Sequence, residues 1–239
     1  MSASKSKRGF SKENFAGKVF FLLLKVLLLF LVFSLFQIVV LRFLPVYRTP
    51  LMYSRWIQED YEIEHDWVPY GEISENMAIA MVAAEDGNFM NHKGFDLDAL
   101  MSAAKHNAKG GNVHGGSTIS QQTAKNVFLW QGRSFLRKGL EAYYTFLIEF
   151  CWDKKRIMEV YLNSIEFGPG IYGVEAASQH YYNCKASELT QRQAESLAAI
   201  VPSPLKRNPL HPDAVTLRHR YRLHKGFSYV KRKKLYPTP

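Results

Sequence analysis

The hydropathy pattern begins with a run of apolar residues from 19 to 41, VFFLLLKVLLLFLVFSLFQIVVL. The run holds one charged residue, Lys25, and is about as long as a helix that crosses the hydrocarbon core of a bilayer. Residues 1–18 carry five cations against one acid, Glu13. Because cytoplasmic flanks carry an excess of Lys and Arg, we expect residues 1–18 to form a cytoplasmic basic tail. Residues 19–41 are then a single transmembrane helix, and the rest of the chain lies outside the cytoplasm.

The alternative for this run is a cleaved signal peptide, whose apolar core would be shorter and followed by small residues. The segment RFLPVYRTP follows instead, without an A-x-A-like site, so the sequence favours a retained anchor. Residues 42–72 are interpreted as a membrane-proximal connector, because they are rich in Pro, Tyr and Trp and have no clean period. The connector either lies along the membrane surface on its aromatic residues or packs on the domain that follows.

From residue 73 onward the apolar spacing becomes that of helices. Positions 73, 77, 80, 81 and 84 lie on one helical face, and Ser74 is placed to cap the helix start. Further helices are predicted over residues 98–108 and 117–129. Apolar residues at positions 136, 140, 144, 147 and 151 share one face of another helix.

The remaining boundaries are marked by capping and turn residues. Asp153 is placed to cap a helix, and FGPG at 167–170 predicts a turn. Thr190 and Gln193 form a capping box before a last helix. Strand signals are weak throughout, so we expect a mainly α fold.

Chain length and net charge leave several functions open. The chain has 239 residues, room for one main domain, and a formal net charge of +10. This charge favours nucleic acid, acidic lipid or a phosphorylated substrate as partner. The cysteines, Cys151 and Cys184, form no metal-binding motif and are interpreted as buried thiols. We expect the domain to cover residues 73–210 and a basic C-terminal tail residues 211–239. Residues 218–234 are either a frayed, solvated segment or a patch for the membrane surface.

Candidate chemistry begins with HGGSTISQQTAKN, residues 114–126. The segment from Gly110 to Ser117 nearly matches the phosphate-binding pattern G-x-x-x-x-G-K-[ST]. Gly116 stands in place of the lysine and no apolar strand precedes it, so we exclude nucleotide hydrolysis. Glycines before Ser-Thr at a helix start still present backbone N–H groups and hydroxyls to an anion. Lys125 would follow about two turns into that helix.

A second candidate is Glu85 in EDGNFMNHKGFD, residues 85–96. Glu85 ends the helix predicted from residue 73. The negative end of the helix dipole and the neighbouring Val82 and Phe89 would raise the pKa of its carboxyl group. A raised pKa suits a general base. A surface Glu-Asp pair that merely ends a helix is the alternative.

The segment RKGLE, residues 137–141, places Arg137 and Lys138 one helical turn from Glu141. In one interpretation these residues form an ordinary surface ion pair. In the other, the cations form a clamp for phosphate oxygens, which Arg binds with two hydrogen bonds. Glu141 then orients the cations or holds a divalent metal.

Several motifs follow one another in a definite order. ED-x-x-F-x-x-H-x-G begins at residue 85, G-x-S-T-x-x-Q-Q-x-x-K-N at 115 and R-K-x-x-E at 137. K-x-x-I, Y-L-N-x-x-x-F-G and LTQRQAESLAAIVPSP come next. In this order they resemble the peptidoglycan glycosyltransferase domain of class A penicillin-binding proteins. The resemblance is strongest to its free-standing form, the monofunctional biosynthetic peptidoglycan transglycosylases of Gram-negative bacteria. It covers about residues 45–210, and after Pro209 we recognise no motif.

The resemblance implies a lysozyme-like fold with two lobes around a cleft, and an enzyme that builds glycan strands in cell-wall biosynthesis. The acceptor would be lipid II, an undecaprenyl-pyrophosphate disaccharide-pentapeptide. The donor would be the growing glycan on its own pyrophosphate lipid. By analogy with inverting glycosidases, a single displacement from an α-linked pyrophosphate to a β-1,4 glycan needs one base and no covalent intermediate.

The residues that match the motifs take their roles from the resemblance. Glu85 is the catalytic base for the acceptor 4-hydroxyl, and Glu141 is the second essential carboxylate. The leaving pyrophosphate is neutralised by cations, and Mg²⁺ or Mn²⁺ assists, with Glu141 as candidate ligand. The cations are Lys125, Arg137 and Lys138; the substrate-binding loop supplies Ser117, Thr118, Gln121, Gln122 and Asn126; and Asp86, Phe89 and His92 shape the surroundings of the base.

The resemblance also implies a location and partners. We expect a single-pass protein of the bacterial inner membrane, with the N-terminus in the cytoplasm and the catalytic domain in the periplasm. Other cell-wall synthases such as penicillin-binding proteins are the expected protein partners, and nucleic acid is not expected as a partner.

Three other functions are weighed against this one. A lytic enzyme of the same fold would need a general acid and no pyrophosphate cations, so the cation set argues against it. An inactive scaffold of the cell-wall machinery stays open, although two intact carboxylates disfavour it. For transpeptidation only Ser102 to Lys105 fits S-x-x-K, and no K-T-G or K-S-G follows, so we interpret that match as chance.

Overall fold

The computed structural model describes residues 12–108 and 116–238, and the chain divides into two units after Leu41. The first unit holds one helix, α1 (Lys12–Leu41). Its segment Phe15–Leu41 has a mean hydropathy of 2.9 and is long and apolar enough to cross a membrane. At about 1.5 Å per residue, the helix is roughly 45 Å long. The helix expected over residues 19–41 is confirmed, and it begins earlier, at Lys12.

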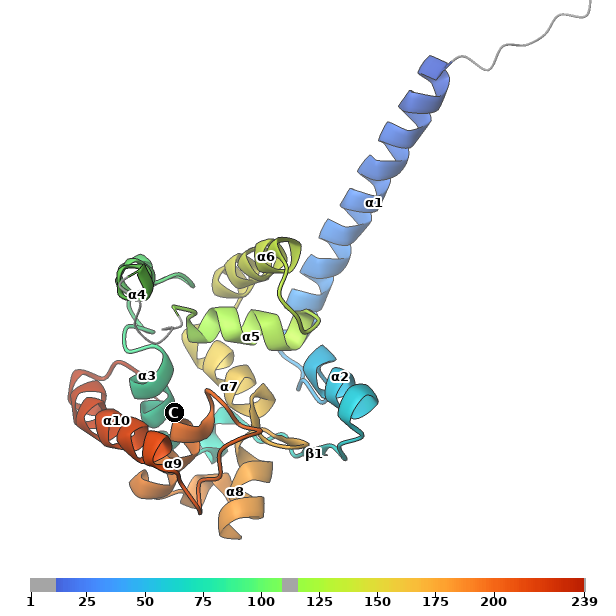
Figure 1. Ribbon diagram of the computed structural model, residues 1–239. Helices are drawn as coiled ribbons and strands as arrows, with labels where there is room; N and C mark the ends of the chain where they lie inside the picture. Colours follow the sequence, from blue (N-terminus) through green and yellow to red (C-terminus); the bar gives the residue numbers. More distant parts are fainter. Residues whose placement is uncertain (1–11, 109–115, 239) are drawn as a thin grey trace, which may run out of the picture. The chain divides into compact units, whose positions relative to one another are not determined.

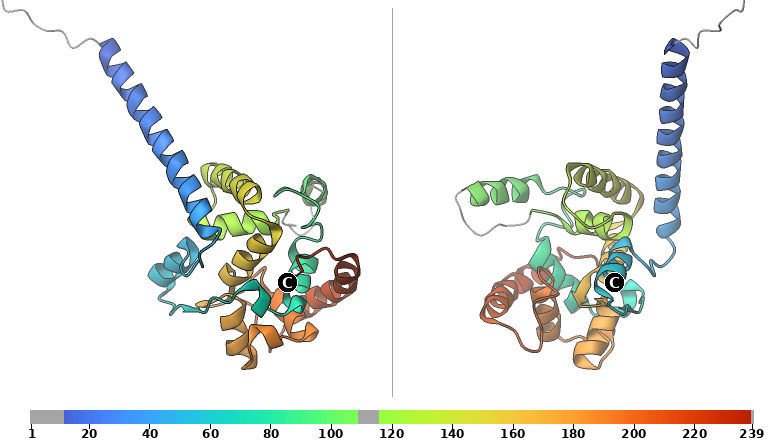
Figure 2. Two further views of the ribbon diagram at one scale, coloured as in Figure 1. Left: turned by 180° about the vertical axis from the view of Figure 1, so that it is seen from behind. Right: turned by 45° about the vertical axis from the view of Figure 1, so that its right-hand side comes forward.

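The second unit is built mainly of helices joined by short loops, with one small sheet (Figures 1 and 2). Its elements are α2 (Pro50–Glu59), β1 (Glu64–His65), the 3₁₀ turn η1 (Tyr70–Glu72), α3 (Glu75–Glu85), α4 (Leu97–Ala108), α5 (Ile119–Phe128), α6 (Phe135–Cys151), α7 (Lys154–Ser164), β2 (Glu166–Gly168), β3 (Ile171–Tyr172), α8 (Val174–Tyr182), the 3₁₀ turn η2 (Ala186–Glu188), α9 (Gln191–Ile200) and α10 (Ala214–Lys233). In the sheet, β3 lies between β1, which is parallel to it, and β2, which is antiparallel. The mainly α fold is confirmed.

Helix α3 lies at the centre of one group of helices in this unit. Its residues from Met77 to Val82 are all buried, because α9 and α10 both pack against it and against each other. A second group consists of α5 with α6 and α7 packed on it. The C-terminal end of α3 reaches α5 through a hydrogen bond from Gln122 to Glu85. Glu85 therefore lies where the two groups of helices meet.

The C-terminal stretch is a folded helix rather than a tail. Helix α10 begins at the N-cap Asp213, whose side chain accepts a hydrogen bond from the backbone N–H of Thr216. Leu223, Phe227 and Val230 are buried against α3 and α9. The interpretation of residues 218–234 as a frayed segment is therefore wrong, whereas the interpretation as a patch for the membrane surface stays a prediction for the exposed face. The boundary expected at residue 210 differs from the structure, in which residues 42–239 form one unit.

The stretch expected to be a connector packs on the domain, which was one of its two interpretations. Leu51 and Met52 of α2 are buried in a cluster with Tyr172 of β3. Glu64 and His65 extend the sheet by pairing with β3. The boundary expected at residue 72 therefore also falls inside the unit rather than at its edge.

The buried face of α6 differs from the one that its apolar residues predict. The buried residues are Glu141, Tyr144, Thr145 and Ile148. Of the predicted face only Tyr144 is among them; Leu136 is 70% exposed. The prediction was wrong because it assumed that apolar side chains face inward, whereas α6 turns two polar residues inward.

Most of the predicted local signals are confirmed. Asp153 caps α7, and Thr190 with Gln193 forms the capping box of α9. Ser74 stands at the start of α3 but makes no capping bond, since its hydroxyl donates to the carbonyl of Leu189. The turn predicted at 167–170 joins β2 to β3, and Gly170 has a φ of 76°. Cys151 and Cys184 are free thiols, each partly buried.

We expect Phe227→Ala to destabilise the second unit by about 3 kcal/mol, because it empties a fully buried site between α10 and α3. Chemical denaturation of the full chain in detergent, followed by circular dichroism, measures this change. Tyr229→Ala is the matched control, since Tyr229 is half exposed on the same helix and should cost under about 1 kcal/mol. Equal effects of the two changes would contradict the assignment of α10 to the core.

Candidate active site

The carboxylate of Glu85 stands at the last position of α3, at the junction with α5. Its Oε2 accepts a hydrogen bond of 2.8 Å from Nε2 of Gln122. Burial raises the pKa of Glu85, and the negative charge of Asp86 adds to that effect. The hydrogen bond from Gln122 and the charges of His219 and Lys125 oppose the rise in pKa without reversing it. Glu85 therefore has the desolvated environment that a general base requires.

Asp86 forms a buried network beside this base. Nε2 of His92 lies 2.9 Å from Oδ1 of Asp86, and the backbone N–H of Ile119 donates to Oδ2 at 3.0 Å. The backbone N–H of Gly94 donates to Nδ1 of His92 at 3.1 Å. Since Nδ1 is an acceptor, the ring proton resides on Nε2 and points at Asp86. Asp86 and His92 thus tie the end of α3 to the start of α5, and the supporting role expected for them stays a prediction.

Phe89 completes the surroundings of the base. Its ring is fully buried and lies edge-on to that of His92. The ammonium group of Lys154 lies 4.4 Å from the centre of the Phe89 ring, a cation–π contact. The role expected for Phe89 beside the base stays a prediction.

The start of α5 uses its polar groups within the protein. Thr118 and Gln121 form a capping box, and the hydroxyl of Thr118 also donates to the carbonyl of Gly94 at 2.7 Å. The N–H of Ile119 is taken by Asp86. This helix start was expected to present such groups to a bound anion; instead, several of them hold a carboxylate and side chains of the chain itself. Most of the expected glycine-rich loop, residues 109–115, lies outside the described residues.

The other loop residues differ in how they are placed. Gln122 points to Glu85, as described above, and Asn126 is buried on the same helix. Ser117 is partly buried just before the N-cap of α5. The substrate-binding roles expected for these residues, and for Thr118 and Gln121, stay predictions.

Helix α6 carries a carboxylate held between two cations. NH1 of Arg137 lies 2.8 Å from Oε2 of Glu141, and Nζ of Lys138 donates to Oε1. The side chain of Glu141 is 4% exposed, whereas that of Lys138 is 49% exposed. The pair is therefore more than an ordinary surface ion pair, because the anion is buried and only one cation reaches solvent freely.

Lys125 links this cluster to Glu85. Burial lowers the pKa of Lys125, and the charges of Arg137 and Lys138 lower it further. The charges of Glu141 and Glu85 oppose this decrease in pKa, so Lys125 interacts electrostatically with both carboxylates. Lys125 is therefore within electrostatic range of both carboxylates, and the roles expected for these five residues stay predictions.

Two residues near Glu85 were not selected as site residues from the sequence. The hydroxyl of Tyr161, on α7, lies 3.4 Å from Oε1 of Gln122, and its pKa is raised well above the usual value by burial and by Glu85 and Asp86. His219, on α10, lies 3.1 Å from the carbonyl oxygen of Ala199 through Nδ1. Tyr161 looked architectural in its helix. His219 lay in the stretch interpreted as a tail, although the apolar spacing at 223, 227 and 230 was a signal for a helix.

The described residues do not fit a metal ion held by Glu141. Each of its carboxylate oxygens already accepts a hydrogen bond from a cation. Across residues 12–108 and 116–238, no three His, Cys, Asp or Glu side chains are grouped as ligands. Cations are poor neighbours for a further cation, so this cluster is better suited to an anion.

Comparison with known proteins agrees with the geometry. A family model described as Transglycosylase matches residues 53–226. A biosynthetic peptidoglycan transglycosylase of Caulobacter vibrioides is 48% identical over 211 residues, covering 88% of this chain and 92% of the relative. A protein with the same description from Pseudomonas syringae pv. tomato is 47% identical over 201 residues, covering 82% and 85%. One from Pseudomonas fluorescens is 48% identical over 187 residues, covering 76% and 78%.

The helical fold thus carries a carboxylate of raised pKa, Glu85, and a cluster of cations around the buried Glu141. The chain belongs to the transglycosylase family, whose model covers most of its length. It is therefore a glycosyltransferase, and the resemblance found in its motifs is confirmed. The match also extends to residue 226, into α10, where no motif was recognised.

We expect Glu85→Gln to increase the free energy of unfolding at neutral pH, because it removes a desolvated charge and leaves an oxygen for Gln122 to bond. The pKa of Glu85 is raised in the folded state, so the unfolded chain ionises first as pH rises. The wild type therefore loses stability as pH rises from the ordinary pKa of Glu to the raised one. Denaturation at several pH values measures the advantage of the variant, which should disappear in acid.

Glu72→Gln is the control for that measurement, because Glu72 is exposed and precedes the same helix. It should show no such pH-dependent gain. A stability of Glu85→Gln equal to or below that of the wild type at neutral pH would mean that desolvation of Glu85 is not the dominant effect.

We expect Glu141→Gln to destabilise the protein by about 2 kcal/mol, because it removes the anion that lies among Arg137, Lys138 and Lys125. Millimolar inorganic pyrophosphate should restore stability more in this variant than in the wild type. Thermal unfolding with and without pyrophosphate measures both effects. The control Glu75→Gln removes an exposed pair with Lys231 and should change stability by under about 1 kcal/mol. If pyrophosphate stabilised the variant no more than the wild type, the result would argue against an anion site.

Proposed function

We propose that the chain polymerises the glycan strands of peptidoglycan during cell-wall biosynthesis. In this proposal it transfers the growing, lipid-pyrophosphate-linked glycan onto the 4-hydroxyl of lipid II. The new linkage is β-1,4, the configuration at the donor carbon is inverted, and undecaprenyl pyrophosphate is released. The observations that support the proposal are the buried carboxylate of Glu141 between Arg137 and Lys138, and Glu85 held by Gln122 at the junction of α3 and α5.

In the proposed chemistry Glu85 acts in its ionised form, and its raised pKa makes it a stronger base. Glu85 takes the proton of the acceptor hydroxyl as its oxygen attacks the donor carbon. The bond from that carbon to the pyrophosphate breaks, and its electron pair leaves with the pyrophosphate. Lys125, Arg137 and Lys138 would neutralise that departing charge. Since one base suffices for a single inverting displacement, no covalent intermediate on the chain is needed.

Two apolar features support a lipid-linked substrate. Helix α1 is long and apolar enough to anchor the chain in a membrane. Helix α6, which carries the cation cluster, also exposes large apolar side chains: Phe135 and Leu136 near its start, and Phe146 and Phe150 near its end. Apolar groupings of this kind are unusual on a soluble surface and are typical of a membrane or lipid contact.

The location and partners belong to the same proposal. The chain would span the inner membrane once, with its N-terminus in the cytoplasm and its catalytic unit in the periplasm, as the excess of cations in residues 1–18 favours. Lipid II and the lipid-linked glycan would be its substrates. Other cell-wall synthases, such as penicillin-binding proteins, would be its partners. Mg²⁺ or Mn²⁺ would act only as an ion that accompanies the pyrophosphate, since the described residues offer no ligand set of their own.

The test is incubation of the purified full chain in detergent with labelled lipid II, with and without Mg²⁺, followed by separation of polymer from monomer. We expect polymer from the wild type and at least a hundredfold less from Glu85→Gln, because the base is lost. Glu75→Gln, at the other end of the same helix, should polymerise as the wild type does.

Other outcomes select other functions. Polymer from Glu85→Gln at the wild-type rate would remove Glu85 from the role of base. Cleavage of finished glycan, rather than polymerisation, would indicate a lytic enzyme. A folded wild type that neither polymerises nor cleaves would indicate a scaffold.

A further inference from the structure

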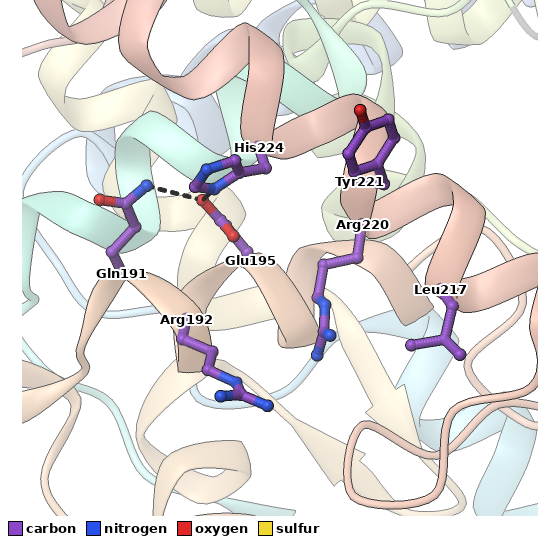
Figure 3. Close-up of a pocket in the computed structure, with 7 residues that line it drawn as sticks. All are labelled: Gln191, Arg192, Glu195, Leu217, Arg220, Tyr221 and His224. Atoms are coloured by element: carbon purple, nitrogen blue, oxygen red, sulfur yellow. Dashed lines mark hydrogen bonds and ion pairs between the residues drawn. The ribbon is translucent and has the colours of Figure 1, made fainter.

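Helices α9 and α10 enclose a pocket of about 620 Å³ whose lining residues are all outside the candidate active site (Figure 3). Glu195 of α9 is buried there and accepts hydrogen bonds of 2.8 Å from Nε2 of Gln191 and from Nδ1 of His224. The negative charge in the pocket is therefore already satisfied by neighbours.

The two arginines that line the pocket, Arg192 and Arg220, differ from Glu195 in their partners. Arg192 of α9 is exposed, and Arg220 of α10 donates to the hydroxyl of Ser196 at 3.2 Å. Among the described residues, neither guanidinium forms an ion pair with a carboxylate. In Figure 3 both side chains extend into the same part of the pocket, from two different helices. Two converging guanidinium groups are suited to a carboxylate, which each can bind with paired hydrogen bonds.

The surroundings of the pocket strengthen this preference. Residues 214–233, which form α10, contain seven Lys and Arg residues and no Asp or Glu. Leu217 and Tyr221 line the pocket beside the cations and are exposed. The surface is thus suited to an acidic segment of polypeptide that also carries apolar side chains.

The chain itself displays such a segment. Residues 59–66, EDYEIEHD, hold five of the 21 acidic residues of the chain and include Tyr61 and Ile63. Glu59 pairs with Arg55, and Glu64 with His180. Asp60 and Glu62 are exposed and, within the part of the chain that the structure describes, have no cationic partner. Their carboxylates are therefore available to another molecule.

The backbone of this acidic segment is held in place. Ile63 packs on the buried cluster of Leu51, Met52 and Tyr172, and the N–H of Glu64 donates to the carbonyl of Gly170 at 2.9 Å. The strand β1 then pairs with β3. Because residues 63–65 are already fixed, this part of the segment loses little conformational entropy when it binds.

Within one copy, the two charged surfaces cannot meet. In Figure 1 and in the left view of Figure 2, α2 and β1 lie on one side of the second unit and α10 lies on the other. The terminal segment 1–11 and the segment 109–115 carry cations and no acid, so neither of them complements the pocket. We propose that the acidic segment 59–66 of one copy docks into the α9–α10 pocket of a second copy.

This contact is heterologous, because a different surface is used on each copy, so it builds rows or closed rings rather than only pairs. Charge complementarity of this kind mainly sets orientation and the rate of encounter. Copies that share a membrane through α1 are confined to a surface, which raises their effective concentration and allows a weak contact to operate. The proposal does not depend on which reaction the active site performs.

The test is a charge exchange measured by energy transfer between donor-labelled and acceptor-labelled full chains in phosphatidylcholine vesicles, which carry no net charge. The segment variant is Asp60→Lys with Glu62→Lys, and the pocket variant is Arg192→Glu with Arg220→Glu. We expect each variant alone to lose at least tenfold in association, because like charges then oppose each other at the contact. A mixture of the two variants should regain energy transfer, since each supplies the charge that the other now needs. Rising NaCl should weaken the wild-type signal.

The matched control is Arg218→Glu with Arg222→Glu, which changes the same charge on exposed positions of the same helix outside the pocket. It should keep the wild-type signal. Arg192→Glu alone, at an exposed residue, should reduce association even if Arg220→Glu harms folding.

Three results would overturn the proposal. The first is wild-type energy transfer no greater than that of unassociated labels. The second is failure of the mixture to recover while both variants remain folded by circular dichroism. The third is a pocket variant that loses binding to phosphatidylglycerol vesicles while the wild type shows no self-association, which would assign the pocket to anionic lipid instead.

Discussion

The carboxylate of Asp86 joins the two groups of helices that make up the second unit. It receives the N–H of Ile119 at the start of α5 and the ring N–H of His92, while its own backbone continues directly from α3. A buried carboxylate is tolerated only with such partners, because desolvation without them costs several kcal/mol. The geometry of these bonds therefore fixes the end of α3 against α5, and with it the position of Glu85 beside Gln122 and Lys125.

The two site carboxylates differ because their surroundings differ. Glu141 has a cation on each oxygen, whereas Glu85 has an amide from Gln122 and a buried environment. The cations are thus held close to the site by Glu141 while the pKa of Glu85 remains raised. Glu141, which is ion-paired, holds the cations, whereas Glu85, which accepts a hydrogen bond from an amide, is the carboxylate suited to proton transfer. Burial also lowers the pKa of Lys125. Burial thus disfavours the charged form of both Glu85 and Lys125.

The sequence predicted the features of this fold that depend on neighbouring residues. The capping box of α9 and the cap of α7 need only a few positions along the chain, and the motifs located the charged residues of the site. Features set by tertiary packing were missed. The prediction of the inward face of α6 was wrong because it counted only apolar residues. Glu141 and Thr145 are polar but buried, and each forms hydrogen bonds within the protein. Helix α10 was missed because its many cations hid a narrow apolar stripe, and His219 was missed with it.

The position of α10 in the chain has a consequence for the timing of synthesis. Helix α3, which ends at Glu85, is made early, yet the helices that bury it begin only at Gln191 and Ala214. Until those residues have left the ribosome, the apolar side chains from Met77 to Val82 lack their partners and remain open to solvent or to a chaperone. The core around α3 is therefore incomplete until α10 has been synthesised. The candidate active site at the end of α3 acquires its final surroundings only when that late helix has folded.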